Sequence, residues 1–293
     1  ESEASGLAVE SGLDILPGHL LPIGVEEIGA FGMVCWLASI AYGADAVVLL
    51  THDGLAMGVA EEMNKQLGYA RQIMEGMGYD PACLSMLDEG KMRDDGSAWQ
   101  ALPQGLIANP AVFIAPDEKR TIVKMAVDHL YEQAPEPAEV VGLPAAAPFG
   151  EIAVDTEACT LCMGCVAVCP SAALIDGKEL PQLKFMEWNC VQCGLCEAAC
   201  PENAIERKPR FLFDARARQQ SRVLHEEPPF CCVTCGKAFA TRSMMERMAE
   251  KLEQHWMFQT EEARRRMQMC EDCRVKDMMM SGPAGNGSGG QVG

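Results

Sequence analysis

Apolar and polar positions recur with helical spacing in three long segments before residue 135. These segments are Val25–Gly43, Val59–Gly78 and Asp117–Gln133, and their periodicity predicts three helices with one buried face. Two short apolar runs, Ala46–Leu50 and Cys83–Leu87, separate the predicted helices. Helices that alternate with short buried strands are typical of an α/β domain with a parallel sheet. We therefore expect such a domain over residues 1–134.

One part of the first predicted helix is unusually apolar. Ile28–Ala44 contains no charged side chain over 17 residues, which is near the lower limit for a membrane span. Glycines interrupt the run and a strand-like segment follows at once, so we expect a buried core helix and no membrane span. The chain begins at Glu1 rather than Met and shows no signal peptide, which leaves an upstream segment open.

The rest of the chain divides by composition. Prolines punctuate residues 135–150, which we expect to be a linker. Two cysteine-rich segments follow, at 151–215 and 216–280, and within the first of them Asp214–Gln220 is charged and helix-prone. Residues 281–293 are rich in glycine and are expected to form a flexible tail.

Cysteine is the most informative residue type. The chain has 15 cysteines, and 13 of them follow residue 158 in C-x-x-C spacing. Such clustered pairs in a chain of this size predict metal sites rather than a disulfide framework. Metal-bound thiolates imply a reducing compartment, so we expect a cytoplasmic protein.

The charge balance narrows the class of partner. The net charge is −18, and residues 1–150 carry −15 of it. This acidity gives no indication of a nucleic-acid-binding surface.

Two identical cysteine motifs lie between residues 151 and 215. Each has the spacing C-x-x-C-x-x-C-x-x-x-C-P, and the cysteines are Cys159, Cys162, Cys165 and Cys169 in the first, and Cys190, Cys193, Cys196 and Cys200 in the second. This is the spacing of bacterial proteins with two [4Fe–4S] clusters, in which the fourth cysteine of each motif binds the other cluster. We therefore expect cluster 1 on Cys159, Cys162, Cys165 and Cys200, and cluster 2 on Cys190, Cys193, Cys196 and Cys169.

The flanks of the motifs support the same interpretation. Short strand-like runs precede and follow each motif, so that the arrangement is written twice. About 60 residues resemble the bacterial 2[4Fe–4S] ferredoxin family, whose fold is strand–helix–strand repeated twice. With every cysteine present, no iron is left open for substrate chemistry, which favours electron relay over catalysis.

A second cysteine group lies nearer the C-terminus. Cys232-x-x-Cys235 and Cys270-x-x-Cys273 form two C-x-x-C pairs joined by a spacer of helical pattern. Two such pairs predict a tetrahedral four-thiolate site, for which we favour Zn²⁺ over a third Fe–S cluster. Cys231 is a spare thiol that is an alternative ligand to Cys232. Residues 216–280 should then be a small, metal-stabilised helical module.

The predicted α/β domain contains fewer functional motifs than the cysteine-rich segments. It contains neither a G-x-G-x-x-G sequence after a strand nor a P-loop, so a flavin or nicotinamide is not indicated. Thr51-His52-Asp53-Gly54 follows a predicted strand, where α/β proteins often bind ligands, although turn and capping roles are commoner for such residues. Cys35 and Cys83 are expected in the core. The pattern of helix, turn, strand and helix resembles the delta subunit of methyl-viologen-reducing hydrogenases, without that domain's cysteines, which implies a docking scaffold.

The order of the segments also has a precedent. It resembles the multi-cluster iron–sulfur proteins of bacterial formate dehydrogenases, including the sequence Met-Cys-Glu-Asp-Cys-Arg-Val-Lys-Asp at 269–277. This resemblance implies a non-catalytic electron-transfer subunit in a hetero-complex with redox-enzyme subunits. The alternatives are an oxidoreductase whose α/β domain binds a flavin or NAD(P), and an assembly factor for a metalloenzyme.

Overall fold

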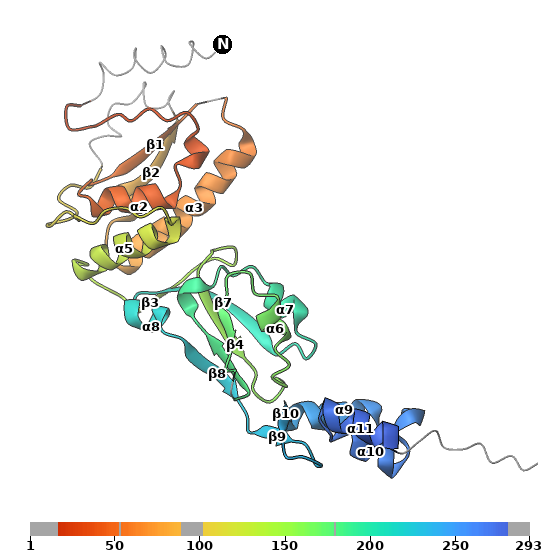
Figure 1. Cartoon of the computed structure of the whole chain (residues 1–293). Helices are drawn as coiled ribbons and strands as arrows, with labels where there is room; N and C mark the ends of the chain where they lie inside the picture. Colours follow the sequence, from red (N-terminus) through yellow and green to blue (C-terminus); the bar gives the residue numbers. More distant parts are fainter. Residues whose placement is uncertain (1–16, 53, 89–101, 179, 281–293) are drawn as a thin grey trace, which may run out of the picture. The chain divides into compact units, whose positions relative to one another are not determined.

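The computed structural model describes residues 17–52, 54–88, 102–178 and 180–280 (Figure 1). The chain forms two compact units. The first consists of the residues up to Ala147 together with Pro209–Ala215, and the second of Pro148–Lys208 together with the residues from Arg216 onward. The expected α/β domain at 1–134 is described only in part, and the expected tail at 281–293 lies outside the described residues.

The first unit is an α/β layer. Strands β1 (Val47–Thr51) and β2 (Leu84–Asp88) are parallel, with Val47 opposite Leu84. The helices around them are α2 (Met33–Ala41), α3 (Met57–Gly76) and α5 (Lys119–Glu132), with the short 3-10 turns η2 (Ile28–Ala30) and η3 (Pro81–Cys83). Helix α2 packs against α5, and α3 packs against β2. The predicted parallel sheet is therefore confirmed.

Helix α2 is shorter than its hydrophobic pattern predicts. The expected helix began at Val25, whereas α2 begins at Met33 after the separate turn η2. Glycine is the reason, because Gly29 and Gly32 lie in this stretch and Gly32 is extended at the N-cap. The uncharged run supplies core rather than a membrane span, since Trp36 and Ile40 are fully buried. Among the described helices, none has the length and apolarity needed to cross a membrane.

Helices α3 and α5 match their predicted segments to within two residues at each end. A glycine ends the first of them for a geometric reason. Gly78 has a φ of +82°, and a side chain there would come within 2.7 Å of the backbone nitrogen of Glu136. The start of α5 is capped by Glu118, whose carboxylate accepts a hydrogen bond of 2.8 Å from the amide of Thr121.

Residues 135–150, expected to be a linker, contain a strand. Strand β3 (Val140–Gly142) pairs antiparallel with the end of β7 (Ile205–Leu212), with Val141 opposite Phe211. Phe213 follows β7 and also belongs to the first unit, and its ring stacks on Tyr131 at 5.0 Å. A three-residue strand between prolines has too little apolar alternation to be recognised from the sequence.

The second unit begins with a repeated strand–helix–strand arrangement. Its elements are β4 (Gly150–Val154), α6 (Gly164–Ala167), β5 (Leu174–Asp176), β6 (Gln182–Phe185), the 3-10 turn η5 (Glu187–Asn189), α7 (Leu195–Ala199) and β7. Strand β5 pairs antiparallel with β6, with Leu174 opposite Phe185. Ile152, Leu161 and Leu183 are buried in the same core as the cysteines.

A short helix and one more strand follow β7 in the chain. Helix α8 (Ala215–Gln219) lies where the charged segment predicted a helix. Strand β8 (Arg222–Glu226), which the sequence did not reveal, pairs antiparallel with β6. The C-terminal cysteine module follows, with the hairpin β9 (Pro229–Cys231) and β10 (Ala238–Thr241), helices α9 (Arg242–Leu252), α10 (Glu261–Met267) and α11 (Glu271–Met280), and the turn η6 (Trp256–Phe258).

The core of the first unit yields a stability prediction. Ile40 is fully buried in α2, so Ile40→Ala is expected to lower the free energy of unfolding of this unit by about 2–5 kcal/mol. Native-state hydrogen exchange of the α2 and α5 amides measures it. Val112→Ala is the matched control, because Val112 is 96% exposed and its truncation should cost no more than about 0.5 kcal/mol. Equal effects of the two variants would contradict the described packing.

Candidate metal centres

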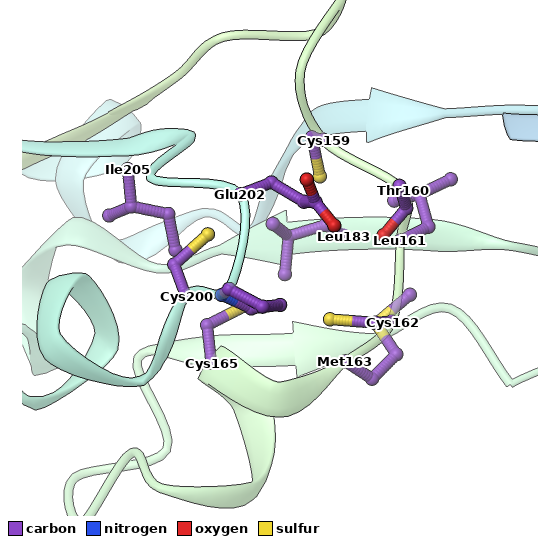
Figure 2. Close-up of a pocket in the computed structure, with 11 residues that line it drawn as sticks. Cys159, Thr160, Leu161, Cys162, Met163, Cys165, Leu183, Cys200, Glu202 and Ile205 are labelled. Atoms are coloured by element: carbon purple, nitrogen blue, oxygen red, sulfur yellow. The ribbon is translucent and has the colours of Figure 1, made fainter. Parts of the chain in front are cut away.

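The first cysteine loop, Cys159–Cys165, surrounds a pocket in the second unit. Figure 2 shows Cys159, Cys162 and Cys165 around this pocket together with Cys200, which directly follows α7 in the second motif. Leu161, Leu183 and Ile205 are among the apolar residues that complete the lining. Three cysteines of one motif and the last cysteine of the other thus share one pocket.

The two motifs have the same backbone path. Leu161 and Gln192 each lie two residues after the first cysteine of their motif, and have positive φ angles of 52° and 54°. Met163 and Gly194 lie two residues further on and have φ angles of 59° and 81°. Left-handed residues are uncommon outside glycine, so their recurrence at equivalent positions shows a repeated loop. This tight curve brings cysteines two residues apart to the same side of the chain.

The electrostatics of the first loop fit a metal cluster. Burial is the main cause that raises the pKa of Cys165 to about 12, and the nearby Cys159 and Cys162 thiols contribute to the same rise. Burial also raises the pKa of Cys159, where Cys200 is one of the neighbouring groups that add to the effect. Thiols in such a site ionise only when a cationic centre compensates their charge. Four thiols that line one largely apolar pocket form a donor set that suits a [4Fe–4S] cluster.

The second cysteine loop, Cys190–Cys196, is more deeply buried at two of its thiols. Cys190 and Cys196 are each 7% exposed. Burial raises the pKa of Cys196 to about 11. The side-chain amide of Gln192, itself buried, donates a hydrogen bond of 3.3 Å to the sulfur of Cys190. This loop therefore carries a hydrogen-bond donor aimed at a candidate ligand sulfur.

Arg207 on β7 fixes the second loop. Its Nη1 donates to the carbonyl of Gln192 at 2.6 Å, and its Nε donates to the carboxylate of Glu197 at 2.5 Å. Gly194 lies under the guanidinium, since a side chain there would approach Arg207 Cζ to 3.1 Å. The requirement for glycine at this position thus has two causes, the positive φ and the close approach of Arg207.

Cys169, the last cysteine of the first motif, differs from its neighbours. Burial acts to raise its pKa, but hydrogen bonds from the amides of Leu174 and Ala173 outweigh burial and hold the pKa of Cys169 below its usual value. The pocket of the first loop does not include Cys169. It is partly buried and packs against the core that contains Cys190 and Cys196, as Cys159 and Cys165 also do.

Residues 151–201 match the family model described as a 4Fe-4S dicluster domain. This segment is a ferredoxin-type 4Fe–4S dicluster domain. The match contains both cysteine motifs, including Cys200, and all of the pocket lining except Glu202 and Ile205. The segment is therefore an iron–sulfur electron-transfer domain, and the expected resemblance to ferredoxins is confirmed.

Curated relatives of the dicluster domain agree. The chain is 40% identical over 53 residues to Ferredoxin-1 of Caulobacter vibrioides, and 40% identical over 58 residues to pyruvate synthase subunit PorD of Thermotoga maritima. It is 32% identical over 62 residues to ferredoxin-type protein NapH of Haemophilus influenzae. These alignments cover 17–20% of this chain. They span 45% of Ferredoxin-1, 57% of PorD and 22% of NapH.

A separate four-cysteine group lies beyond the dicluster domain. The sulfur atoms of Cys232, Cys235, Cys270 and Cys273 all lie within 4.8 Å of one another. The first pair comes from the β9–β10 connection and the second from the start of α11. Cys231 is exposed and is not one of the four. The group is compatible with metal binding, as the two C-x-x-C pairs predicted.

The thiols of this group influence one another strongly. Desolvation opposes ionisation of Cys232, but amide hydrogen bonds from Cys270, Cys235 and Thr234 outweigh it and lower the pKa of Cys232 to about 6. The pKa of Cys273 is raised to about 12, chiefly by the hydrogen bond with Cys235. The opposite shifts of Cys232 and Cys273 show that the thiols of this compact site interact, and a cation bound there would compensate the charge of deprotonated ligands.

The remaining candidate residues belong to the first unit. The Nδ1 atom of His52 accepts a hydrogen bond of 3.0 Å from the amide of Gly54, which makes His52 a turn residue. Asp53 lies outside the described residues. Cys83 is fully buried, and burial raises its pKa to about 12. Cys35 is half-buried, and burial raises its pKa as well.

The sequence did not indicate a role for three polar residues near the cysteines. They are Gln192, Arg207 and Glu202, the last of which lines the pocket of the first loop. Gln192 and Glu202 are adjacent to motif positions, and this proximity was the available signal. Arg207 holds the second loop because Glu197 lies beside it in the folded chain, and the residue pattern does not show that they are neighbours.

The hydrogen bond to Cys190 yields a prediction on redox potential. An N–H···S bond stabilises the more negative, reduced state of a cluster, so Gln192→Leu is expected to lower the midpoint potential of the cluster at the second loop. A hydrogen bond of about 1 kcal/mol corresponds to a shift of roughly 40 mV for one electron. Potentiometric titration followed by EPR measures it.

The control for this titration is Gln66→Leu, because Gln66 hydrogen-bonds to Glu62 on the exposed side of α3. It should leave both midpoint potentials unchanged. A Gln192→Leu variant whose two potentials equal those of the wild type would show that this hydrogen bond does not act on a cluster.

Proposed function

We propose that this chain relays electrons through two [4Fe–4S] clusters between redox partners. The observation that carries the proposal is the pocket shared by three cysteines of the first motif and Cys200 of the second. Four protein thiolates complete the coordination of a cubane and leave no iron free for substrate. The clusters supply one-electron oxidation and reduction. The chain supplies the thiolates, the apolar shield and the hydrogen bonds that set the potential.

The proposed ligand sets cross between the motifs. Cluster 1 takes Cys200 in addition to the first loop, and cluster 2 takes Cys169 in addition to the second loop. The pocket in Figure 2 supports the first set. The second set is supported by the absence of Cys169 from the lining of that pocket and by its packing, shared with Cys159 and Cys165, against the core that contains Cys190 and Cys196. Crossing makes each site depend on both halves of the domain, so that neither half holds a cluster alone.

At the C-terminal cysteine group we propose a single Zn²⁺ ion. Zinc–sulfur bonds of about 2.3 Å in a tetrahedron place the sulfurs roughly 3.8 Å apart, and the Cys235 and Cys270 sulfurs are 3.6 Å apart. In a cubane each thiolate binds a different iron at an outer corner, which requires wider separations than the 4.8 Å limit of this group. The compact geometry supports one ion over a third cluster, and Cys232 over Cys231 as the ligand.

We propose redox-enzyme subunits as the partners. The relatives of the dicluster domain include a protein named as a subunit of pyruvate synthase. An acidic first unit that offers no recognisable cofactor motif fits a docking scaffold for a basic surface. The resemblance of residues 269–277 to proteins of formate dehydrogenases makes such an enzyme the first partner to test.

The relay is tested by anaerobic reduction and reoxidation of the reconstituted full chain. Dithionite should reduce it by about two electrons per chain, as two cubanes imply, and oxidised cytochrome c should return the original absorbance in the visible region. Cys196→Ser, which removes one proposed ligand of cluster 2, should reduce the reversible absorbance change by about half. Gln66→Leu should leave it unchanged.

Two results would contradict the relay. One is a chain that binds iron and sulfide but cannot be reduced. The other is a yellow purified protein that reduces dyes with NAD(P)H on its own, which would favour a flavin-linked oxidoreductase.

A further inference from the structure

The C-terminal cysteine module contacts a segment that carries proposed ligands of cluster 1. The hydroxyl of Thr241, at the end of β10, donates a hydrogen bond of 2.9 Å to the carbonyl of Thr160. Thr160 lies between Cys159 and Cys162 in the first cysteine loop, and lines its pocket. Both threonines are buried, at 4% and 6% exposure. The module is therefore attached directly to the loop that forms the pocket.

A second contact ends at another residue that lines the same pocket. Glu202 follows Cys200 by two residues, lines the pocket and is 15% exposed (Figure 2). Two cations of helix α9 pair with its carboxylate, Lys251 Nζ at 3.0 Å and Arg247 Nη1 at 3.9 Å. A carboxylate beside a site that gains an electron opposes that gain, and paired cations offset the opposition.

The four-cysteine group holds the elements that make these contacts. Strand β9 ends next to Cys232 and pairs with β10, and the amide of Cys232 donates to the carbonyl of Lys237 at 2.8 Å. Strand β10 ends at Thr241, which also caps α9, because its hydroxyl accepts a hydrogen bond from the amide of Met244. The position of α9 thus follows from the hairpin that the cysteines close.

We propose that the C-terminal cysteine module is a clamp on cluster 1, and the proposal rests on the two-cluster function above. The metal ion fixes α9, and Lys251 and Arg247 neutralise Glu202, so that the module sets the midpoint potential of cluster 1. Cluster 2 is outside its influence, since the second loop is held by Arg207 and Glu197 instead. Metal occupancy at the C-terminal group thereby controls one of the two redox centres.

Charge variants test the clamp with opposite signs. In an EPR-monitored potentiometric titration of the reconstituted full chain, the double variant Arg247→Met, Lys251→Met should lower one midpoint potential, because Glu202 is left uncompensated. Glu202→Gln should raise the same potential, because the two cations then lack their counter-charge. The other potential, which is the one that responds to Gln192→Leu, should stay at its wild-type value in both variants.

The control variant is Lys237→Met. Lys237 belongs to the same module but pairs with the exposed Asp272 at 3.6 Å, so its removal should move neither potential. Equal shifts of both midpoint potentials, shifts of one sign in the two charge variants, or no shift would each overturn the clamp. A wild-type chain without any reducible cluster would instead defeat the proposed function.

Removal of the metal gives the second arm. Cys270→Ser should lose the C-terminal metal and shift the potential of cluster 1 in the direction seen for Arg247→Met, Lys251→Met. Thr241→Val should act in the same way, and Thr241→Ser, which keeps the hydroxyl, should restore the wild-type potential. A Cys270→Ser chain that lacks the metal and still titrates as the wild type would show that the module does not control cluster 1.

Discussion

Thiolates cannot remain charged in an apolar interior unless a cation compensates them, and the second unit is arranged around that constraint. Several of its cysteines pack among leucines, isoleucines and Phe185, and burial there raises the pKa of the Cys165 and Cys196 thiols. A pair of iron–sulfur clusters would remove this conflict, and the proposed crossed ligand sets would add covalent links between the two halves. The helices and strands of this small domain are short, and bound clusters would add to its core.

The same constraint explains which predictions from the sequence succeeded. Cysteine spacing is imposed by metal geometry, so the two long motifs identified the dicluster domain and the two later C-x-x-C pairs located the four-cysteine group. Helices α3 and α5 and the parallel strands followed from their apolar periodicity. Helix α2 was overextended, because the apolar pattern continues through Gly29 and Gly32 although the helical backbone does not. Domain limits and ligand sets stay predictions.

Other features depend on tertiary pairing and were invisible in the residue pattern. Strand β8 is recognisable only through its pairing with β6, and β3 only through β7. The hydrogen bond of Gln192 to Cys190, and the pairing of Glu202 with α9, join residues whose types alone carry no redox signal. These contacts differ between the two cysteine loops, so the proposed clusters each have four cysteine ligands but different surroundings. Such a difference would order the two centres in potential.

The most direct test of the two-cluster account is iron, sulfide and zinc analysis of the anaerobically reconstituted chain, combined with EPR spin quantification after dithionite reduction. The account predicts about eight iron, eight sulfide and one zinc per chain, with about two spins. About four iron with a single spin would contradict the two crossed ligand sets. About twelve iron without zinc would contradict the single ion proposed at Cys232, Cys235, Cys270 and Cys273.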